Sequence, residues 1–232
     1  MVNLKVYEIN MLLYLLKDIE KDKCMEEITN FIDSGMAKYE DLLNLHIANT
    51  FKMYNYNMFY PIEKEVYLSG NIYSIQIRTI DKKLAEFFNN KLVNNFTDSI
   101  KGLKASTKII PQRQIDKIYS LTPVILKSDE GYWRGVLSLE DFERRLKENL
   151  IKKYNLAMET KIDEDFQLYT SIQFINRKPV PMHYKGRKLL GDKIVLNIGD
   201  DKAAQDLAYM ALGTGILEMN ARGAGYVNFK WI

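Results

Sequence analysis

The spacing of apolar positions changes repeatedly along the chain and predicts an order of strands and helices. In residues 4–16 every second residue from Tyr7 to Leu15 is apolar, so these side chains share one face, which predicts a strand. In residues 22–37 apolar residues recur at helical spacing, with Met25, Ile28 and Ile32 on one face. The next expected elements are a short aromatic-rich strand at 51–61, a strand at 72–80, a helix at 82–95 and a strand at 103–110. The first half therefore has the order β-α-β-β-α-β, which is the ferredoxin-like unit.

The second half predicts the same order, although its sequence does not visibly repeat the first. The expected elements are a strand at 122–127, a helix capped by Ser138, strands at 168–174 and 194–198, a helix capped by Asp200, and a strand at 226–231. We therefore expect an α+β protein with two tandem ferredoxin-like domains, residues 1–118 and 119–232. No Pro/Ser-rich linker separates the halves, so we expect closely packed domains with a cleft between them.

Length and composition narrow the class of protein. The 232 residues suit two domains of roughly 115 residues each. No run of about 18 apolar residues is present, so we expect a cytoplasmic protein without a membrane span. Cys24 is the single cysteine, and His46 and His183 are the only histidines, which excludes a Cys/His zinc site. We expect neither a metal nor another cofactor.

Charge is segregated although the net charge is only +3. Residues 17–41 hold eight acids and four bases, residues 101–117 five bases and one acid, and residues 177–193 six bases and one acid. Basic segments of this kind favour a polyanion-binding surface, because each neutralised phosphate releases counterions. A solvated basic face without a partner is the alternative.

Glycines cluster between the last helix and the last strand. The segment 212–226 holds Gly213, Gly215, Gly223 and Gly225, with side-chain donors on Asn220 and Arg222. Glycine permits positive φ and lets backbone N–H groups approach a phosphate. The segment follows a helix, so it is neither a dinucleotide fingerprint nor a P-loop. The alternative is a helix C-cap followed by a bulged strand.

His46 and Lys52 form the second candidate site. Histidine suits proton transfer near neutral pH, and a lysine can stabilise a phosphorane charge. RNA cleavage needs no metal, since the substrate's own 2′-OH is the nucleophile. Tyr54 and Tyr56 follow and can stack on unpaired bases. The alternatives are a structural histidine and two core tyrosines.

Two further clusters lie in the second half. Lys185, Arg187 and Lys188 follow a Pro-rich stretch and suit phosphate contacts. Asp200 and Asp201 resemble the metal-binding turn of palm-domain polymerases and cyclases, which is a third functional hypothesis. They stand between a strand and a helix, however, where an Asp N-cap is a sufficient explanation.

The chain resembles the CRISPR-associated endoribonuclease family Cas6 of the RAMP superfamily, which processes repeat RNA. Residues 212–226 are similar to the family's pair of G-x-G motifs before an apolar residue, and residues 46–56 to its His, Lys and aromatic-rich segment. The resemblance implies an inter-domain RNA-binding cleft. It also implies metal-independent cleavage of CRISPR repeat RNA into guide RNAs, which leaves a 2′,3′-cyclic phosphate and a 5′-OH.

The resemblance also implies roles for residues. His46 would be the general acid/base and Lys52 the charge stabiliser. Some relatives carry a catalytic tyrosine on the first helix; here Phe31 matches that position, so Tyr39 is the candidate third member. The implied RNA-binding residues are Gly213, Gly215, Asn220, Arg222, Gly223, Gly225, Tyr54, Tyr56, Lys185, Arg187 and Lys188.

The implied partners are CRISPR repeat RNA, other proteins of a CRISPR effector complex and a second copy of the chain in a homodimer, without a membrane. Because Phe31 has no hydroxyl, a non-catalytic RNA-binding subunit of a CRISPR ribonucleoprotein remains the alternative function.

Overall fold

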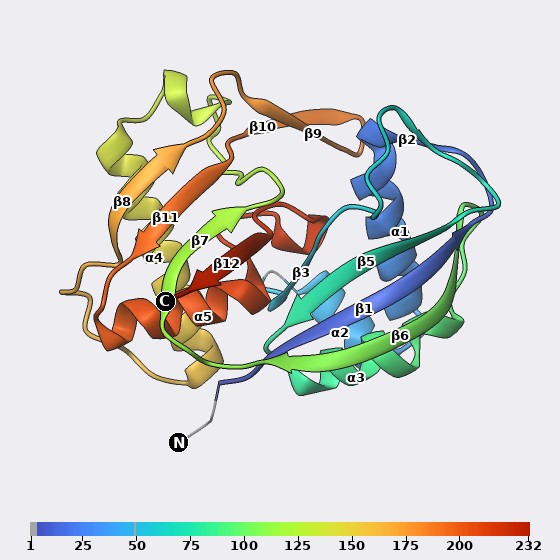
Figure 1. Cartoon of the computed structure of the whole chain (residues 1–232), viewed down its shortest axis with the longest axis horizontal. Coiled ribbons are helices and arrows are strands. Elements are labelled where there is room, and N and C mark those ends of the chain that lie inside the picture. Colours follow the sequence, from blue (N-terminus) through green and yellow to red (C-terminus); the bar gives the residue numbers. More distant parts are fainter. Residues whose placement is uncertain (1–3, 49) are drawn as a thin grey trace.

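The first domain is an antiparallel sheet covered on one face by helices. The computed structural model describes residues 4–48 and 50–232, and of His46 the backbone only. The sheet has the order β3-β5-β1-β6. Its strands are β1 (Val6–Leu15), β3 (Tyr54–Tyr56), β5 (Ile72–Thr79) and β6 (Ile100–Ile110). The helices α1 (Cys24–Met36) and α3 (Lys82–Asn90) lie behind it in Figure 1. The small elements are β2 (Ile19–Glu20), β4 (Val66–Tyr67), α2 (Glu40–Ile47) and two 3₁₀ turns, η1 (Lys21–Lys23) and η2 (Leu92–Asn94).

The second domain repeats this topology. Its sheet has the order β12-β7-β11-β8, so both sheets place their strands in the spatial order four, one, three, two. The strands are β7 (Ile115–Ser120), β8 (Tyr169–Phe174), β11 (Ile194–Ile198) and β12 (Val227–Trp231), and the helices are α4 (Leu139–Met158) and α5 (Lys202–Thr214). A turn, η3 (Trp133–Gly135), precedes α4, and a hairpin of β9 (Val180–Tyr184) and β10 (Arg187–Gly191) precedes β11. The predicted α+β fold of two tandem ferredoxin-like domains is confirmed.

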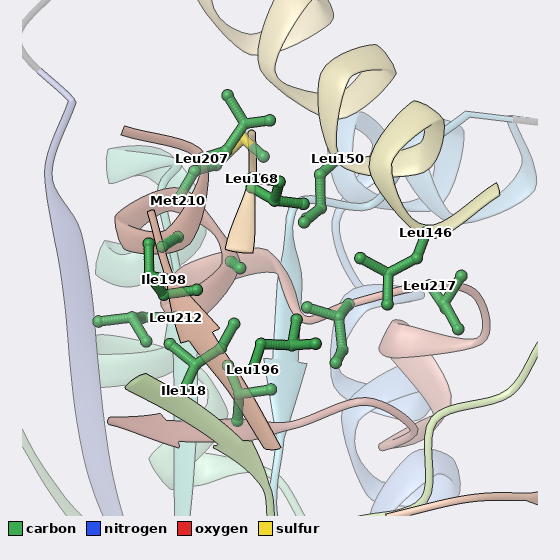
Figure 2. Close-up of a cluster of buried hydrophobic side chains, with 14 of the residues drawn as sticks. Ile118, Leu146, Leu150, Leu168, Leu196, Ile198, Leu207, Met210, Leu212 and Leu217 are labelled. Atoms are coloured by element: carbon green, nitrogen blue, oxygen red, sulfur yellow. The ribbon is translucent and has the colours of Figure 1, made fainter. Parts of the chain in front are cut away.

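The apolar stripe of α4 explains much of the second core. Leu146 and Leu150 lie on the face of α4 that meets the sheet residues Ile118 and Leu196 (Figure 2). Ser138 caps this helix as predicted, since its Oγ accepts a hydrogen bond from the N–H of Asp141 at 3.1 Å. The helix α5 is buried along most of its length because it packs on both domains. Among helices within the described ranges, none is long and apolar enough to cross a membrane.

Two local predictions were wrong. The expected strand at 122–127 is absent; β7 takes its place at 115–120, and Val124 and Ile125 form isolated bridges only. Pro123 lacks the N–H that a central strand must donate, which explains the break. Asp201, rather than Asp200, is the N-cap residue of α5, and it makes no side-chain cap bond.

The last strand of the first sheet, β6, ends at Ile110, and the first strand of the second sheet, β7, begins at Ile115. The domain limits at 118/119 stay a prediction and fall inside β7.

Buried polar contacts join the domains. Arg78 Nε donates to Glu8 Oε2 at 2.7 Å, and Arg78 Nη1 donates to the carbonyl of Val227 at 2.7 Å. Its guanidinium lies 4.7 Å from the ring centroid of Tyr226. Arg78 and Glu8 are each 3% exposed, and Glu8 is also paired with Lys108 at 2.9 Å, so removal of Glu8 would leave the buried Arg78 charge without its carboxylate. The hydrogen bond from Arg78 to Val227, with the Tyr226 ring beside it, therefore fixes how the two sheets face each other.

Candidate functional site

A pocket of about 490 Å³ lies at the junction of the domains. The first domain contributes Phe51 and Lys52, from the segment of residues 50–54 that follows α2. The second domain contributes Lys153 of α4 and residues of the connection between α5 and β12. We call that connection, residues 215–226, the glycine loop; it contains the turn η4 (Asn220–Arg222).

A second hollow of about 580 Å³ continues the pocket beneath the β9–β10 hairpin. The two hollows share Lys127, Met219 and Arg222 and together form what we call the junction groove. Its described lining residues include the cations Lys52, Lys127, Lys153, Lys185, Arg187 and Arg222 and a single acid, Glu218. Glu218 is already engaged, because its Oε2 accepts from the N–H of Lys127 at 3.0 Å and its Oε1 lies 3.6 Å from Arg145 Nη2. The groove therefore suits a polyanion.

Lys153 and Asn220 hold the glycine loop from inside. Lys153 Nζ donates to the carbonyls of Gly215 at 3.0 Å and Leu217 at 2.9 Å, and to Asn220 Oδ1 at 2.7 Å. Asn220 Nδ2 donates in turn to two carbonyls of the loop, those of Ile216 and Ala224, at 3.0 Å each. Lys153 is only 2% exposed, and burial lowers the pKa of its ammonium to about 7. The loop is a closed hydrogen-bonded structure.

The predicted contact of the glycines with RNA is corrected, whereas the role of Asn220, which lines the pocket, stays a prediction. Gly213, Gly215, Gly223 and Gly225 are all buried, so none offers its backbone to an RNA strand. A Cβ on Gly223, at φ +85°, would lie 2.0 Å from Met25 Cε, and one on Gly225 would lie 2.1 Å from the carbonyl oxygen of Ile216. These glycines allow tight packing of the loop, and Gly215 forms the C-cap of α5.

Lys52 lies where the first domain meets the glycine loop. Its Nζ donates to the carbonyls of Leu45 and Ala48, at the C-terminal end of α2. Burial and the nearby Arg222 lower the pKa of Lys52, and Asp33 partly offsets them. His46 stands in α2 next to Leu45, and its side chain lies outside the described part of the structure. The structure thus brings Lys52 and Arg222, two predicted site residues from different domains, into one pocket.

Arg222 ties the glycine loop to the first domain. Its Nη1 donates to Asp33 Oδ2 of α1 at 2.6 Å, and its guanidinium lies 5.3 Å from the ring centroid of Tyr184. The side chain is 17% exposed and borders both parts of the groove. Arg222 therefore borders the groove while it is paired with Asp33, and its contact with RNA stays a prediction.

Tyr54 and Tyr56 are core residues, which corrects their predicted role as base-stacking platforms. They are 1% and 0% exposed. Tyr54 packs edge-on against Phe88 at 5.3 Å between ring centroids, and the Tyr56 hydroxyl is hydrogen-bonded to Thr29 Oγ1. Rings enclosed in this way cannot stack on an RNA base.

Tyr39 packs away from the pocket. Its ring lies edge-on to Phe87 of α3 at 5.8 Å, and Tyr39 is not among the described residues that line the groove. Phe31 is fully buried in the first core. Tyr39 is therefore placed outside the described groove lining, and its role as third catalytic member stays a prediction.

The basic residues 185–188 form the turn and the start of β10 in the β9–β10 hairpin, which reaches across to α1 (Figure 1). The N–H of Lys185 donates to Glu26 Oε1 at 3.1 Å, and His183 Nδ1 lies 3.1 Å from Asp22 Oδ2. Lys185 and Arg187 line the junction groove, whereas Lys188 is exposed beside it.

The groove residues that were not predicted from the sequence include Phe51, Lys127 and Lys153. A signal for Lys153 was present, because it stands three residues after Leu150 on the apolar stripe of α4. A lysine on a buried helical face needs acceptors, and the glycine loop supplies them.

Solved structures share this fold over nearly the whole chain. A RAMP protein described as binding different RNA substrates has a TM-score of 0.73 at 17% identity, with 97% of this chain and 99% of that chain covered. A CRISPR-associated protein Cas6 has a TM-score of 0.67 at 18% identity, covering 97% and 99%. A Cas6-related protein from Pyrococcus furiosus has 0.67 at 15%, covering 97% and 98%. No curated protein matches the sequence.

At these identities the likeness shows the fold, that of the tandem ferredoxin-like proteins. Residues 105–229 match the family model of CRISPR-associated protein Cas6, C-terminal. The match spans more than half of the 232 residues, so the chain belongs to the Cas6 family. The resemblance found in the sequence is confirmed.

Proposed function

We propose that this protein is a metal-independent endoribonuclease that cleaves CRISPR repeat RNA to give guide RNAs. The supporting observation is the junction groove, where Lys52 of the first domain and Arg222 of the second border one basic pocket. A single strand lying along the groove meets cations from both domains. Family membership and the fold agree with this substrate.

In the proposed reaction the RNA supplies the nucleophile. His46 takes the proton of the 2′-OH while water protonates the leaving 5′ oxygen, or His46 protonates the leaving 5′ oxygen while water takes the 2′-OH proton. The 2′ oxygen attacks the adjacent phosphorus, the bond to the 5′ oxygen breaks, and the products are a 2′,3′-cyclic phosphate and a 5′-OH. Lys52 and Arg222 offset the charge on the phosphorane oxygens. Burial of Lys52 strengthens this attraction because less water screens it.

The implied partners are CRISPR repeat RNA and other CRISPR proteins. One Cas6 of the same fold, at 16% identity, was solved as a product complex, and another, at 10% identity, within a Cas6-RT-Cas1–Cas2 complex. We extend these partners to the present chain as part of the proposal. A homodimer and a cytoplasmic location are further predictions.

The direct test is to incubate the wild-type protein with a panel of CRISPR repeat RNAs in EDTA. We expect cutting at one position of the best-bound repeat and a 2′,3′-cyclic phosphate in the product mass. His46→Ala should abolish cutting, while Lys161→Ala, at an exposed lysine outside the groove, should leave it unchanged. Loss of cutting in EDTA would disprove the metal-free mechanism, and full activity of His46→Ala would remove His46 from it.

A non-catalytic RNA-binding subunit is the second candidate function. It is favoured by Phe31, which is buried and lacks a hydroxyl where some relatives have tyrosine. Tight binding of repeat RNA without any cleavage, with or without Mg²⁺, would select this function over the first.

A further inference from the structure

We propose that the pocket beside Phe51 takes one unstacked nucleobase of the bound RNA, with Phe51 as the stacking surface. This inference rests on the proposed function, since it assigns a subsite to the same RNA. Phe51 is the member of the aromatic-rich segment 51–61 that lines the pocket with a partly exposed ring, whereas Tyr54 is 1% exposed.

The dimensions and apolar walls of the pocket suit a base. Its volume of about 490 Å³ lies within the range of about 300–1,000 Å³ that is usual for small-molecule sites. Phe51, Met219 and Leu156 line it with an aromatic ring and aliphatic groups. Single-stranded RNA is commonly bound by stacking of splayed bases on aromatic side chains.

The position of Phe51 is fixed relative to the glycine loop. Lys153 Nζ lies 5.7 Å from the Phe51 ring centroid while it holds the carbonyls of Gly215 and Leu217. The ring is therefore placed beside a rigid part of the second domain although it belongs to the first. Such a ring needs little reordering when a base arrives.

The rim of the pocket suits the phosphates on either side of the base. Lys52 stands at one part of the rim, and Lys127 and Arg222 stand where the pocket opens into the second hollow. An apolar protein side chain would gain nothing from these cations, whereas a nucleotide would place its phosphates among them. The strand can then continue beneath the hairpin toward Lys185 and Arg187.

The test is a coupling experiment between one side chain and one base. The probe is the repeat RNA that wild-type protein binds most tightly, with 2′-deoxyribose at the mapped cleavage position and an abasic nucleotide placed at each position in turn. We expect one abasic position near the cleavage site to weaken wild-type binding roughly tenfold. Phe51→Ala should weaken binding of the intact RNA by a similar factor, and the two losses should not add.

Phe96→Ala is the matched control. Phe96 is 66% exposed, Lys38 Nζ lies 5.5 Å from its ring centroid, and Phe96 is not among the described residues that line the groove. Its effect should be small and independent of every abasic position. Phe51→Trp, which keeps a stacking ring, should bind the intact RNA nearly as well as wild type and still lose roughly tenfold at the same abasic position, so that a folding defect of Phe51→Ala does not decide the outcome.

Losses of Phe51→Ala that add to the abasic loss at every position would overturn the nucleobase site. In that case a wild-type protein that binds and cuts repeat RNA would still uphold the proposed function. Failure of the wild-type protein to bind any repeat RNA would overturn both.

Discussion

The glycine loop and the segment of residues 50–54 line the same pocket but are held in opposite ways. The polar groups of the loop are satisfied within the protein by Lys153 and Asn220, and its glycines are buried. The segment keeps Phe51 and Lys52 partly exposed, and among the described residues Lys52 Nζ donates to carbonyls at the end of α2. The comparison indicates that the loop is a hydrogen-bonded frame, whereas the segment presents partly exposed groups to the pocket, as the proposed function requires.

The largest expected effect is on stability, through the hydrogen bonds that hold the glycine loop. Lys153→Ala should lower the free energy of unfolding by roughly 3 kcal/mol, because three buried acceptors lose their donor. Chemical denaturation measures this loss. The neighbouring Lys152→Ala is the control, since its side chain is 67% exposed and forms only a surface ion pair. Equal stability of the two variants would show that Lys153 does not hold the loop.

Substitution in the segment of residues 50–54 should show the opposite pattern, with a large loss of activity and a small loss of stability. Lys52→Ala should reduce the single-turnover cleavage rate roughly 10²-fold, by removing charge stabilisation of the transition state. Its free energy of unfolding should change by less than about 1 kcal/mol, since the side chain is partly exposed. If Lys52→Ala were strongly destabilised but cut RNA at the normal rate, Lys52 would be a structural residue, contrary to this account.

The pH dependence of stability tests the environment of Lys153. Burial lowers its pKa to about 7 in the folded protein, against 10.5 as its ordinary value. Between these values the unfolded chain binds more protons than the folded one, so this group makes stability rise with pH. The carboxylate of Glu218 offsets part of this lowering, and the other charged residues that line the same pocket are Lys52, Lys127 and Arg222.

Denaturation from pH 7 to pH 9 should therefore show wild-type stability rising relative to Lys153→Met. A difference that stays constant, or falls, over this range would contradict a lowered pKa of Lys153.

The smallest expected effect is at the edge of the groove. Arg187→Ala should weaken RNA binding by a few-fold and reduce the slope of log K against log[salt] by about 0.7, the value for one phosphate contact on a single strand. Lys188→Ala should change the slope less, because Lys188 is not among the described groove residues. Filter binding at several salt concentrations compares them; equal slopes would exclude a specific phosphate contact at Arg187.

Local patterns predicted most of the fold because the strands and helices follow the spacing of their apolar residues. The strand at 122–127 failed because partner strands, and Pro123, decide which apolar run enters the sheet. In the site, the sequence singled out Lys52 and Arg222 separately, and the structure places both at one pocket, while their roles stay predictions. It could not show that α1 and α3 cover Tyr54 and Tyr56, with Thr29 and Phe88 as their partners, since burial is set by distant segments.

The central claim is that the RNA supplies its own nucleophile in the junction groove. The most direct measurement compares two forms of the best-bound repeat RNA in EDTA, one with ribose and one with 2′-deoxyribose at the cleavage position. The account predicts equal affinity for both, cleavage of the ribose form alone and a 2′,3′-cyclic phosphate end. Cleavage of the 2′-deoxy form, or a requirement for Mg²⁺ with the ribose form, would contradict it.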